Sequence, residues 1–397
     1  MREAEMRSDV TIIGSGPAGL ATALSLESAG LSVTVLERAP QAALAEPAFD
    51  GREIALTHHS VSVLRNAGAW ARIPPVGISP LREARVETGR HNHPLTFDTN
   101  GQGVEALGYL VSNHMIRQAL YEEAMTRPGI VIRAGVATRR VRDEGESVTV
   151  LAEGGDVTSR LAIAADGRFS EIRRLQGIGA IVHDFHRTML VCRMAHESPH
   201  HHVALQWFDD GQTVALLPVN GGASSLVLTL PPEQIEALRT MEREQFNENI
   251  MARVGNRLGA MRLVSTRHVY PLRAVYAHRF TARRFALIGD AAVGMHPITA
   301  HGFNLGLKGQ DVLAQEIAAG MARDGDPGSA AVLRRFSMRH RLTTAPLFAA
   351  TNGIATLYTR DESPFRYLRR AGLRAADSLA PFKAAVTNML IDRGKTA

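Results

Sequence analysis

Residues 10–38 read VTIIGSGPAGLATALSLESAGLSVTVLER and decide the fold of the first part of the chain. An apolar strand enters a G-x-G-x-x-G turn at Gly14, Gly16 and Gly19, and a helix and a second strand ending on Glu37 follow. The first glycine makes the tight turn, the second lets backbone approach a pyrophosphate, and the third allows close helix–strand packing. The pattern predicts a dinucleotide-binding βαβ unit.

Charge and hydrogen bonding indicate how this unit binds its ligand. The helix after Gly16 presents free N–H groups and the positive end of its dipole to phosphate groups. Glu37 can accept hydrogen bonds from both hydroxyls of a ribose, and its carboxylate would repel a 2′-phosphate. We expect Glu37 and the adjacent Arg38 to lie at the adenosine end of the ligand.

Composition limits the possible classes of protein. The chain has 397 residues, of which 45% are hydrophobic, enough for two domains or one large α/β domain with an insertion. Its single cysteine, Cys192, excludes an internal disulfide and suits a reducing compartment. No leader precedes the first strand and no apolar run could cross a bilayer, so we expect a cytoplasmic protein. We expect no metal, because the consecutive residues 200–202, all His, alternate across a strand without further ligands.

Positive charge is concentrated near the C-terminus. The net charge is +6, yet residues 331–397 alone hold twelve Lys and Arg against four Asp and Glu, a net charge of +8. A basic end on a nearly neutral body favours a membrane surface or a partner over a nucleic-acid groove, although a solvated set of arginine-rich helices is the alternative. Because apolar residues recur at helical spacing in residues 364–397, we expect a peripheral contact with the inner membrane face or with a biosynthetic complex.

Two later segments also place glycine and an acid directly after an apolar strand. Residues 160–165 run into Asp166-Gly167, and residues 284–288 run into Gly289-Asp290. Gly289 permits close backbone approach, Asp290 can accept hydrogen bonds from sugar hydroxyls, and Pro297 ends the loop before a helix that begins near Gly302. The N-terminus of that helix would stabilise negative charge on a bound ring.

The rest of the chain divides into blocks of strands and helices. Strands dominate residues 182–230, and helical patterns occupy 231–258, 303–323 and 328–340. The string GQGVEA at 101–106 also resembles a glycine-rich phosphate turn, but polar residues precede it and no helix follows. We interpret it as a hairpin loop.

With these three motifs the chain resembles the FAD-dependent aromatic hydroxylases of the para-hydroxybenzoate hydroxylase type, and among them the ubiquinone-biosynthesis hydroxylases. In that family the first motif binds the ADP half of FAD, the Asp-Gly motif lies near the pyrophosphate and is associated with FAD and NAD(P)H, and the Gly-Asp motif holds the ribityl chain. The resemblance spans most of the chain through GREIALTHHSVSVLRNAGAW (51–70), GYLVSNHMIRQAL (108–120), AADGRFSEIR (164–173), YPLRAVYAHRF (270–280), RFALIGDAAVGMHPITAHGFNLGL (284–307) and FRYLRRAGL (365–373).

The resemblance implies an α/β (α+β) fold, in which a Rossmann-like FAD-binding domain carries a mostly antiparallel β-sheet substrate domain. The FAD-binding domain is expected in residues 1–77, 108–180 and 270–350, the substrate domain in 78–107 and 181–269, and a C-terminal helical segment in 351–397.

The resemblance also implies the cofactor contacts. Arg52 and Arg117 should contact FAD, Asp290 should bind the ribityl hydroxyls, and no acid–base residue is expected because the cofactor carries the chemistry. The candidates for the flavin edge are Pro297, His301 and Gly302. The residues expected to bind the cofactor are Gly14, Gly16, Gly19, Glu37, Arg38, Arg52, Arg117, Asp166, Gly289, Asp290, Pro297, Gly302 and Asn304.

Four positions depart from the family pattern. Members commonly read Gly-Asp-Ala-Ala-His and then Pro-x-x-Gly-Gln-Gly, ending Asn-x-Gly-x-x-Asp. Here the His, the first Gly of the second string, the Gln and the final Asp are replaced by Val293, Ala300, His301 and Gly309. His301 can donate a hydrogen bond where the glutamine would, and Ala300 needs more room near the ring.

The implied reaction is hydroxylation of an aromatic ring. As the resemblance implies, NAD(P)H reduces FAD, O2 adds at flavin C4a, and the terminal oxygen of the hydroperoxide passes to an electron-rich phenol or quinol. The expected substrate is a polyprenylated ubiquinone precursor. Two alternatives remain open: a flavin hydroxylase of a soluble aromatic compound, and a low-turnover flavin-binding accessory subunit of a biosynthetic complex.

Overall fold

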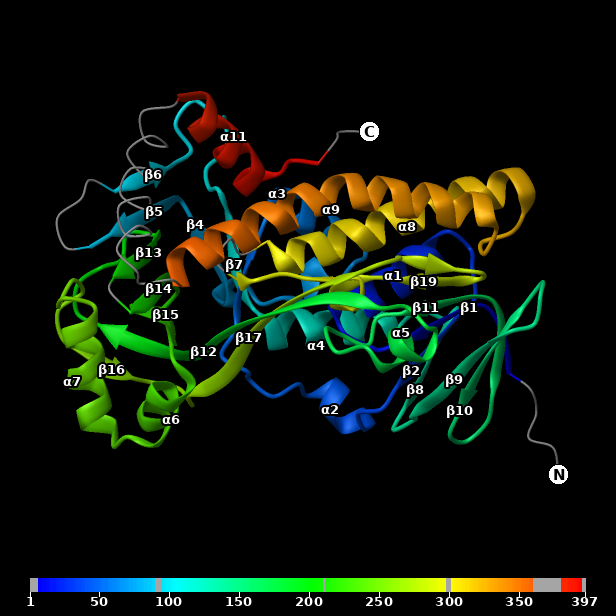
Figure 1. Cartoon of the computed structure of the whole chain (residues 1–397), viewed down its shortest axis with the longest axis horizontal. Helices are drawn as coiled ribbons and strands as arrows, with labels where there is room; N and C mark the ends of the chain where they lie inside the picture. Colours follow the sequence, from blue (N-terminus) through cyan, green and yellow to red (C-terminus); the bar gives the residue numbers. More distant parts are fainter. Residues whose placement is uncertain (1–5, 90–93, 210, 298–300, 360–379, 395–397) are drawn as a thin grey trace.

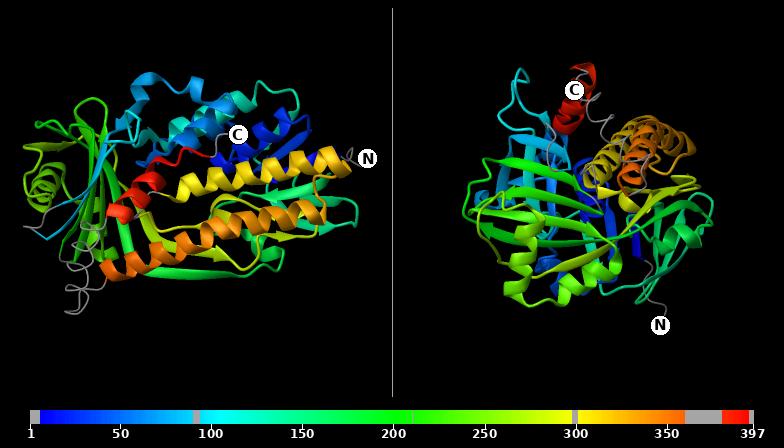
Figure 2. Two further views of the ribbon diagram at one scale, coloured as in Figure 1. Left: turned by 90° about the horizontal axis from the view of Figure 1, so that it is seen from above. Right: turned by 60° about the vertical axis from the view of Figure 1, so that its left-hand side comes forward.

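The structure, a computed structural model, describes residues 6–89, 94–209, 211–297, 301–359 and 380–394. Two large sheets lie toward opposite ends of the long axis, and two long helices run along one side (Figures 1 and 2). Within the described ranges the helices are α1 (Pro17–Ser28), α2 (Gln41–Ala45), α3 (His58–Asn66), α4 (Asn113–Ala124), α5 (Glu171–Leu175), α6 (Pro232–Thr240), α7 (Arg243–Arg253), α8 (Gly302–Asp324), α9 (Ala330–Thr359) and α11 (Ala380–Ile391).

The first sheet contains the predicted βαβ unit. Its strand order is β18-β19-β11-β1-β2-β8, and β9 and β10 extend β11 as an antiparallel ribbon. The β1–β2 pair is parallel, with Val10 opposite Val33, so the prediction for residues 10–38 is confirmed. The strands are β1 (Met6–Ile13), β2 (Val33–Glu37), β8 (Ile130–Ala134), β9 (Thr138–Asp143), β10 (Val148–Ala152), β11 (Val157–Ala164), β18 (Thr281–Ala282) and β19 (Phe285–Leu287).

The second sheet is mostly antiparallel, as predicted. Its order is β20-β17-β12-β15-β14-β13-β5-β6, with β16 also paired to β12 and a parallel pairing between β13 and β5. One face packs on α6 and α7 around Cys192, Leu226 and Phe246, which are fully buried. The strands are β5 (Glu83–Thr88), β6 (Leu95–Phe97), β12 (Ala180–His196), β13 (Val203–Asp209), β14 (Gln212–Val219), β15 (Ala223–Leu230), β16 (Met261–Leu263), β17 (His268–Ala277) and β20 (Val293–Gly294).

A small third sheet and two long strands connect the halves. The third sheet has the order β3-β7-β4, with bounds Glu53–Leu56, Gly108–Ser112 and Ile78–Leu81. Strands β12 and β17 pair from Ala180 opposite Ala277 to Val191 opposite His268, and they run from one half of the molecule into the other (Figure 1). The division into two domains and a C-terminal helical segment stays a prediction, and these two strands contribute to both halves.

Two local predictions are wrong. The loop around residues 101–106 is not a hairpin, because β6 before it belongs to the second sheet and β7 after it to the third. Helix α9 does not end at His340 but continues through Pro346 to Thr359. The buried side chains Phe348 and Ala355 lie beyond the proline, so tertiary packing outweighs the lost backbone hydrogen bond.

Helices α8 and α9 pack side by side along the molecule (Figure 2). The carboxylate of Glu316 on α8 accepts hydrogen bonds from Arg335 and Arg339 on α9 at 2.8 and 2.7 Å. Farther along, His340 stacks on Phe336 with ring centroids 5.6 Å apart. The ionic cluster joins the two helices, whereas the Phe336–His340 stack lies within α9.

Helix α11 packs against the body of the protein. Ile391 at its end is buried in a cluster with Leu81 and Phe97. Lys308 Nζ lies 3.1 Å from Asp392, whose backbone carbonyl accepts a hydrogen bond from the amide of His59. Within the ranges that the structure covers, no helix combines the length and apolar character needed to span a membrane.

The burial of His340 makes stability depend on pH. Burial lowers the pKa of His340 from 6.5 to about 4, because it penalises the imidazolium. The unfolded chain therefore binds an extra proton between these values, and stability should fall by up to about 3 kcal/mol as pH decreases from 6.5 to 4. Urea unfolding at several pH values measures this. H340L should flatten the dependence and H278Q, at an exposed site, should not; an unchanged slope in H340L would exclude this histidine as the source.

Candidate functional site

The three glycine–acid motifs meet at the carboxyl edge of the first sheet. A Cβ placed on Gly14, after β1, would lie 2.6 Å from the carbonyl oxygen of Ala165, after β11. A Cβ on Gly289, after β19, would lie 3.0 Å from Cβ of Ala18 in the first turn of α1. The loops after three parallel strands thus touch, and this edge is where open α/β sheets bind ligands.

In the first turn, Gly14 and Gly19 have no room for a side chain, whereas Gly16 faces open space. Gly14 has φ +105°, and a Cβ on Gly19 would collide with the carbonyl oxygen of Gly14. A Cβ on Gly16 would meet no atom within 4 Å, and Gly16 caps α1 without a side chain. Open space therefore lies in front of Gly16 and the helix N-terminus, where a phosphate group would be stabilised.

Glu37 is held by the turn that precedes α1. Its Oε2 accepts hydrogen bonds from the amide and the hydroxyl of Ser15 at 2.8 and 2.9 Å, and its Oε1 accepts one from the amide of Ala39 at 2.9 Å. The residue stays half-buried and Arg38 beside it is exposed. The oriented carboxylate keeps a lone pair on Oε1 for a further donor, such as a ribose hydroxyl.

The loop after β11 supplies Arg168, which sequence reasoning missed. Its Nε and Nη2 donate to Asp290 at 3.2 and 3.0 Å, and its Nη1 donates to the carbonyl of Arg273 at 2.7 Å. Arg168 thereby ties the Asp-Gly loop to the Gly-Asp loop. Its position directly after Asp166-Gly167 is the only signal in the sequence that could have indicated it.

The carboxylate of Asp166 accepts hydrogen bonds from residues that follow it closely in the sequence. The hydroxyl of Ser170 and the amide of Ile172, 3.1 Å away, donate to its carboxylate at the start of α5. These contacts hold the turn in which Arg168 lies. A direct contact between Asp166 and the cofactor stays a prediction.

Arg52 is held by the carboxylate of Asp50. Its Nε donates to Asp50 at 3.1 Å, and Asn113 on α4 donates to the same carboxylate at 2.8 Å. Burial alone would raise the pKa of Asp50, but the hydrogen bond and charge of Arg52 lower it. Burial would lower the pKa of Arg52, but Asp50, and at longer range Asp290, raise it. Arg117 lies about one turn beyond Asn113 on α4, half-buried.

Helix α8 packs on the Gly-Asp motif through Gly306, in its second turn. A Cβ on Gly306 would be 3.5 Å from Cα of Gly289, whereas one on Gly302 would be 3.9 Å from its nearest neighbour. The side chain of Asn304 accepts a hydrogen bond from the amide of Thr57 and donates to the carbonyl of Ala55, so it anchors α8 to the end of β3. At the helix start His301 is buried, and Pro297 is exposed. Ala300 lies outside the described residues.

Two departures from the family pattern have packing explanations. A Cβ on Gly309 would lie 2.6 Å from Cε1 of His340 on α9, so the usual aspartate would collide with this ring. Val293 is buried on β20, opposite Tyr276 of β17. These positions pack the interior between α8, α9 and the second sheet.

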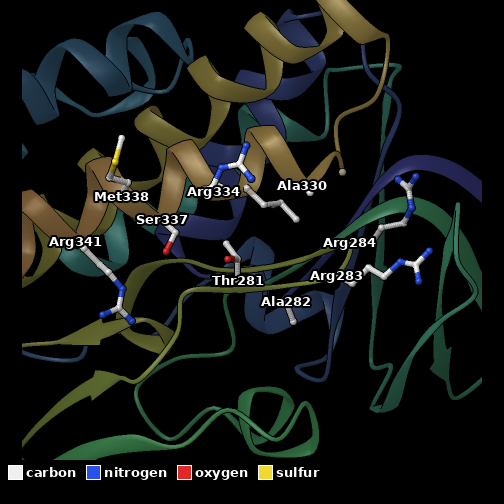
Figure 3. A pocket seen from close by; sticks show the side chains of 11 residues that line it. Thr281, Ala282, Arg283, Arg284, Ala330, Arg334, Ser337, Met338 and Arg341 are labelled. Atoms are coloured by element: carbon white, nitrogen blue, oxygen red, sulfur yellow. The ribbon is translucent and has the colours of Figure 1, made fainter.

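Two cavities in the described part of the chain lie away from these motifs. One, of about 580 Å³, lies between β18–β19 and α9, and its lining includes Arg283, Arg284, Arg334 and Arg341 (Figure 3). The other, of about 750 Å³, lies beside Trp207 in the second sheet. The assignment of the site therefore depends on the contacts at the sheet edge.

A parallel sheet edge with an open glycine turn, an oriented carboxylate and a second helix N-terminus is typical of the dinucleotide-binding class of proteins. The chain belongs to the FAD binding domain family, whose profile matches residues 7–333. The predicted FAD cofactor and the predicted family are thereby confirmed.

Similarity to known proteins extends over nearly the whole chain. The chain is 41% identical to ubiquinone hydroxylase UbiM of Neisseria meningitidis, over 97% of this chain and 85% of that protein. It is 28% identical to 3-demethoxyubiquinol 3-hydroxylase of Escherichia coli, over 95% and 96%. The crystal structure of p-nitrophenol 4-monooxygenase PnpA from Pseudomonas putida has the same fold, with a TM-score of 0.79, 18% identity, and coverage of 99% of this chain and 100% of that chain.

Substitution of the turn glycines should separate binding from folding. G16V places its side chain in open space, so the protein should fold normally but lose most of its FAD because the pyrophosphate approach is blocked. G14A meets the Ala165 carbonyl at positive φ and should destabilise the fold by at least about 2 kcal/mol. Flavin absorbance per protein and thermal unfolding measure the two effects. Full flavin content in a folded G16V protein would move the phosphate site elsewhere.

Proposed function

We propose that this protein is an FAD-dependent monooxygenase that inserts one oxygen atom of O2 into the aromatic ring of a ubiquinone precursor. The main observation that supports this proposal is the 41% identity to a ubiquinone hydroxylase over 97% of the chain. Further relatives are named ubiquinone hydroxylase UbiL and 3-demethoxyubiquinol 3-hydroxylase. The prenyl tail of the substrate and NAD(P)H as electron donor are parts of the proposal that rest on the family resemblance.

Different residues at the sheet edge would bind the pyrophosphate, the adenosine ribose and the ribityl chain of FAD. Gly16 and the N-terminus of α1 would receive the pyrophosphate, and Glu37 would accept hydrogen bonds from the adenosine ribose. Asp290, restrained by Arg168, would accept from ribityl hydroxyls, with the positive charge of Arg52 nearby. Bound FAD supplies the redox and oxygen chemistry.

The protein's own electrostatic contribution comes from α8. Its 23 residues begin at Gly302, one turn before Gly306, which lies against Gly289, and their aligned peptide dipoles place partial positive charge at that end. We assign this end to the N1–O2 edge of the flavin, where it would stabilise an anionic ring. Asn304 holds the first turn in place through the backbone at Ala55 and Thr57.

The hydroxylase assignment is tested with the purified holoenzyme. In the presence of O2 and NADH or NADPH, a short-chain prenylated phenol should gain one oxygen atom, detected by mass spectrometry. Hydroxylation of unprenylated phenols alone would favour the soluble-substrate alternative. NAD(P)H oxidation that yields only hydrogen peroxide would favour the accessory-subunit alternative. The quinone intermediate that accumulates in a strain lacking the protein would identify the ring position.

A peripheral membrane contact is the proposed route to a prenylated substrate. The charge of +8 in residues 331–397 supports it, since each basic residue near an anionic surface contributes about 1 kcal/mol. Arg366, Arg369, Arg370 and Arg374, which we expect to carry the contact, lie outside the described residues. Changing all four to Gln should reduce co-sedimentation with anionic vesicles and leave FAD content unchanged, and salt should weaken the parent's binding. A parent protein that does not sediment with vesicles would exclude this route and leave this segment only a packing role on the body of the protein.

A further inference from the structure

A buried carboxylate follows directly after the cofactor arginine candidate. The side chain of Glu53, next to Arg52, is only 2% exposed. Its Oε1 accepts hydrogen bonds from Nε of Arg193 at 2.9 Å and from Oγ of Ser112 at 2.9 Å. A carboxylate removed from water this far needs such partners to remain charged.

The two partners of Glu53 come from different sheets. Ser112 ends β7 of the small sheet, and Arg193 lies in β12 of the second sheet. Arg193 Nη2 also donates to Oγ of Ser112 at 2.6 Å, so the three side chains form a closed cluster. The guanidinium of Arg193 further lies 5.0 Å from the ring centroid of Phe49.

The cluster is connected to Arg52 by two short links. The first link is the chain itself. Arg193 contacts Phe49 and Glu53, the two ends of the five-residue segment 49–53, which contains Asp50 and Arg52. Along the other, Asn113 follows Ser112 and donates to Asp50, the carboxylate that holds Arg52. The segment is also pinned at Gly51, where a Cβ would lie 2.9 Å from the ring of His268 on β17.

We infer that Arg193 is a positioning residue: it holds segment 49–53 against the second sheet and thereby fixes Arg52 for cofactor binding. This inference rests on the proposed role of Arg52 toward FAD. Removal of Arg193 leaves the Glu53 carboxylate buried without its cation, and the segment must move to rehydrate it. FAD should then be bound more weakly, although no residue proposed to contact FAD has been substituted.

The experiment measures the rate of FAD release from the holoenzyme by the rise in flavin fluorescence. R193M should accelerate release about tenfold, equivalent to roughly 1.4 kcal/mol. R193K keeps the charge but loses the planar two-nitrogen contact, so its effect should be smaller. In the double variant E53Q/R193M the buried charge is gone, and release should be slower than in R193M.

Arg257 offers a matched control. It lies against Glu87 and over Trp207, 4.6 Å from the ring centroid, with the same 31% side-chain exposure as Arg193, but far along the chain from segment 49–53. R257M should lower thermal stability and leave FAD release unchanged. If R193M and R193K release FAD at the rate of the parent, or if R257M accelerates release equally, Arg193 has no positioning role. A parent protein without FAD would instead overturn the proposed function.

Discussion

The backbone contact between Gly14 and Ala165 is the constraint on which the site depends. Only a residue without Cβ allows the loop after β1 to lie against the loop after β11, because a Cβ would come within 2.6 Å of the carbonyl oxygen. The same close packing places Gly19 against Gly14 and Ala18 beside Gly289. As a result, the N-termini of α1 and α8 are held at one edge, with open space in front of Gly16.

Around this edge, charged side chains restrain one another. Arg168 holds Asp290 and thereby joins two separate loops, whereas Arg52 holds Asp50 within one short segment, to which Asn113 on α4 also donates. Partly exposed ion pairs of this kind contribute only about 0–1 kcal/mol to stability. Their larger effect is geometric, because they fix where guanidinium and carboxylate groups point before a ligand arrives.

The second sheet is joined to the nucleotide-binding half by more than chain connections. Strands β12 and β17 pair across both halves, and the Glu53–Arg193–Ser112 cluster joins the second sheet to the small third sheet. Packing between α8 and α9 is equally specific, since His340 occupies the space that a side chain at Gly309 would need. A change in the second sheet can therefore reach the cofactor edge through packed contacts.

The sequence by itself determined the βαβ unit, the Gly-Asp turn and the start of α8, because these depend on glycine spacing and on periodicity within about 30 residues. It also indicated the family, and with it Arg52 and Asp290. Only the tertiary structure decided that Arg168 holds Asp290, 122 residues away, and that Arg193 holds Glu53, 140 residues away. Only the tertiary structure showed that α9 continues through Pro346, and that the loop at 101–106 connects strands of two different sheets. Such contacts leave no local pattern, since they arise when folding brings distant strands together and buried charges must find partners.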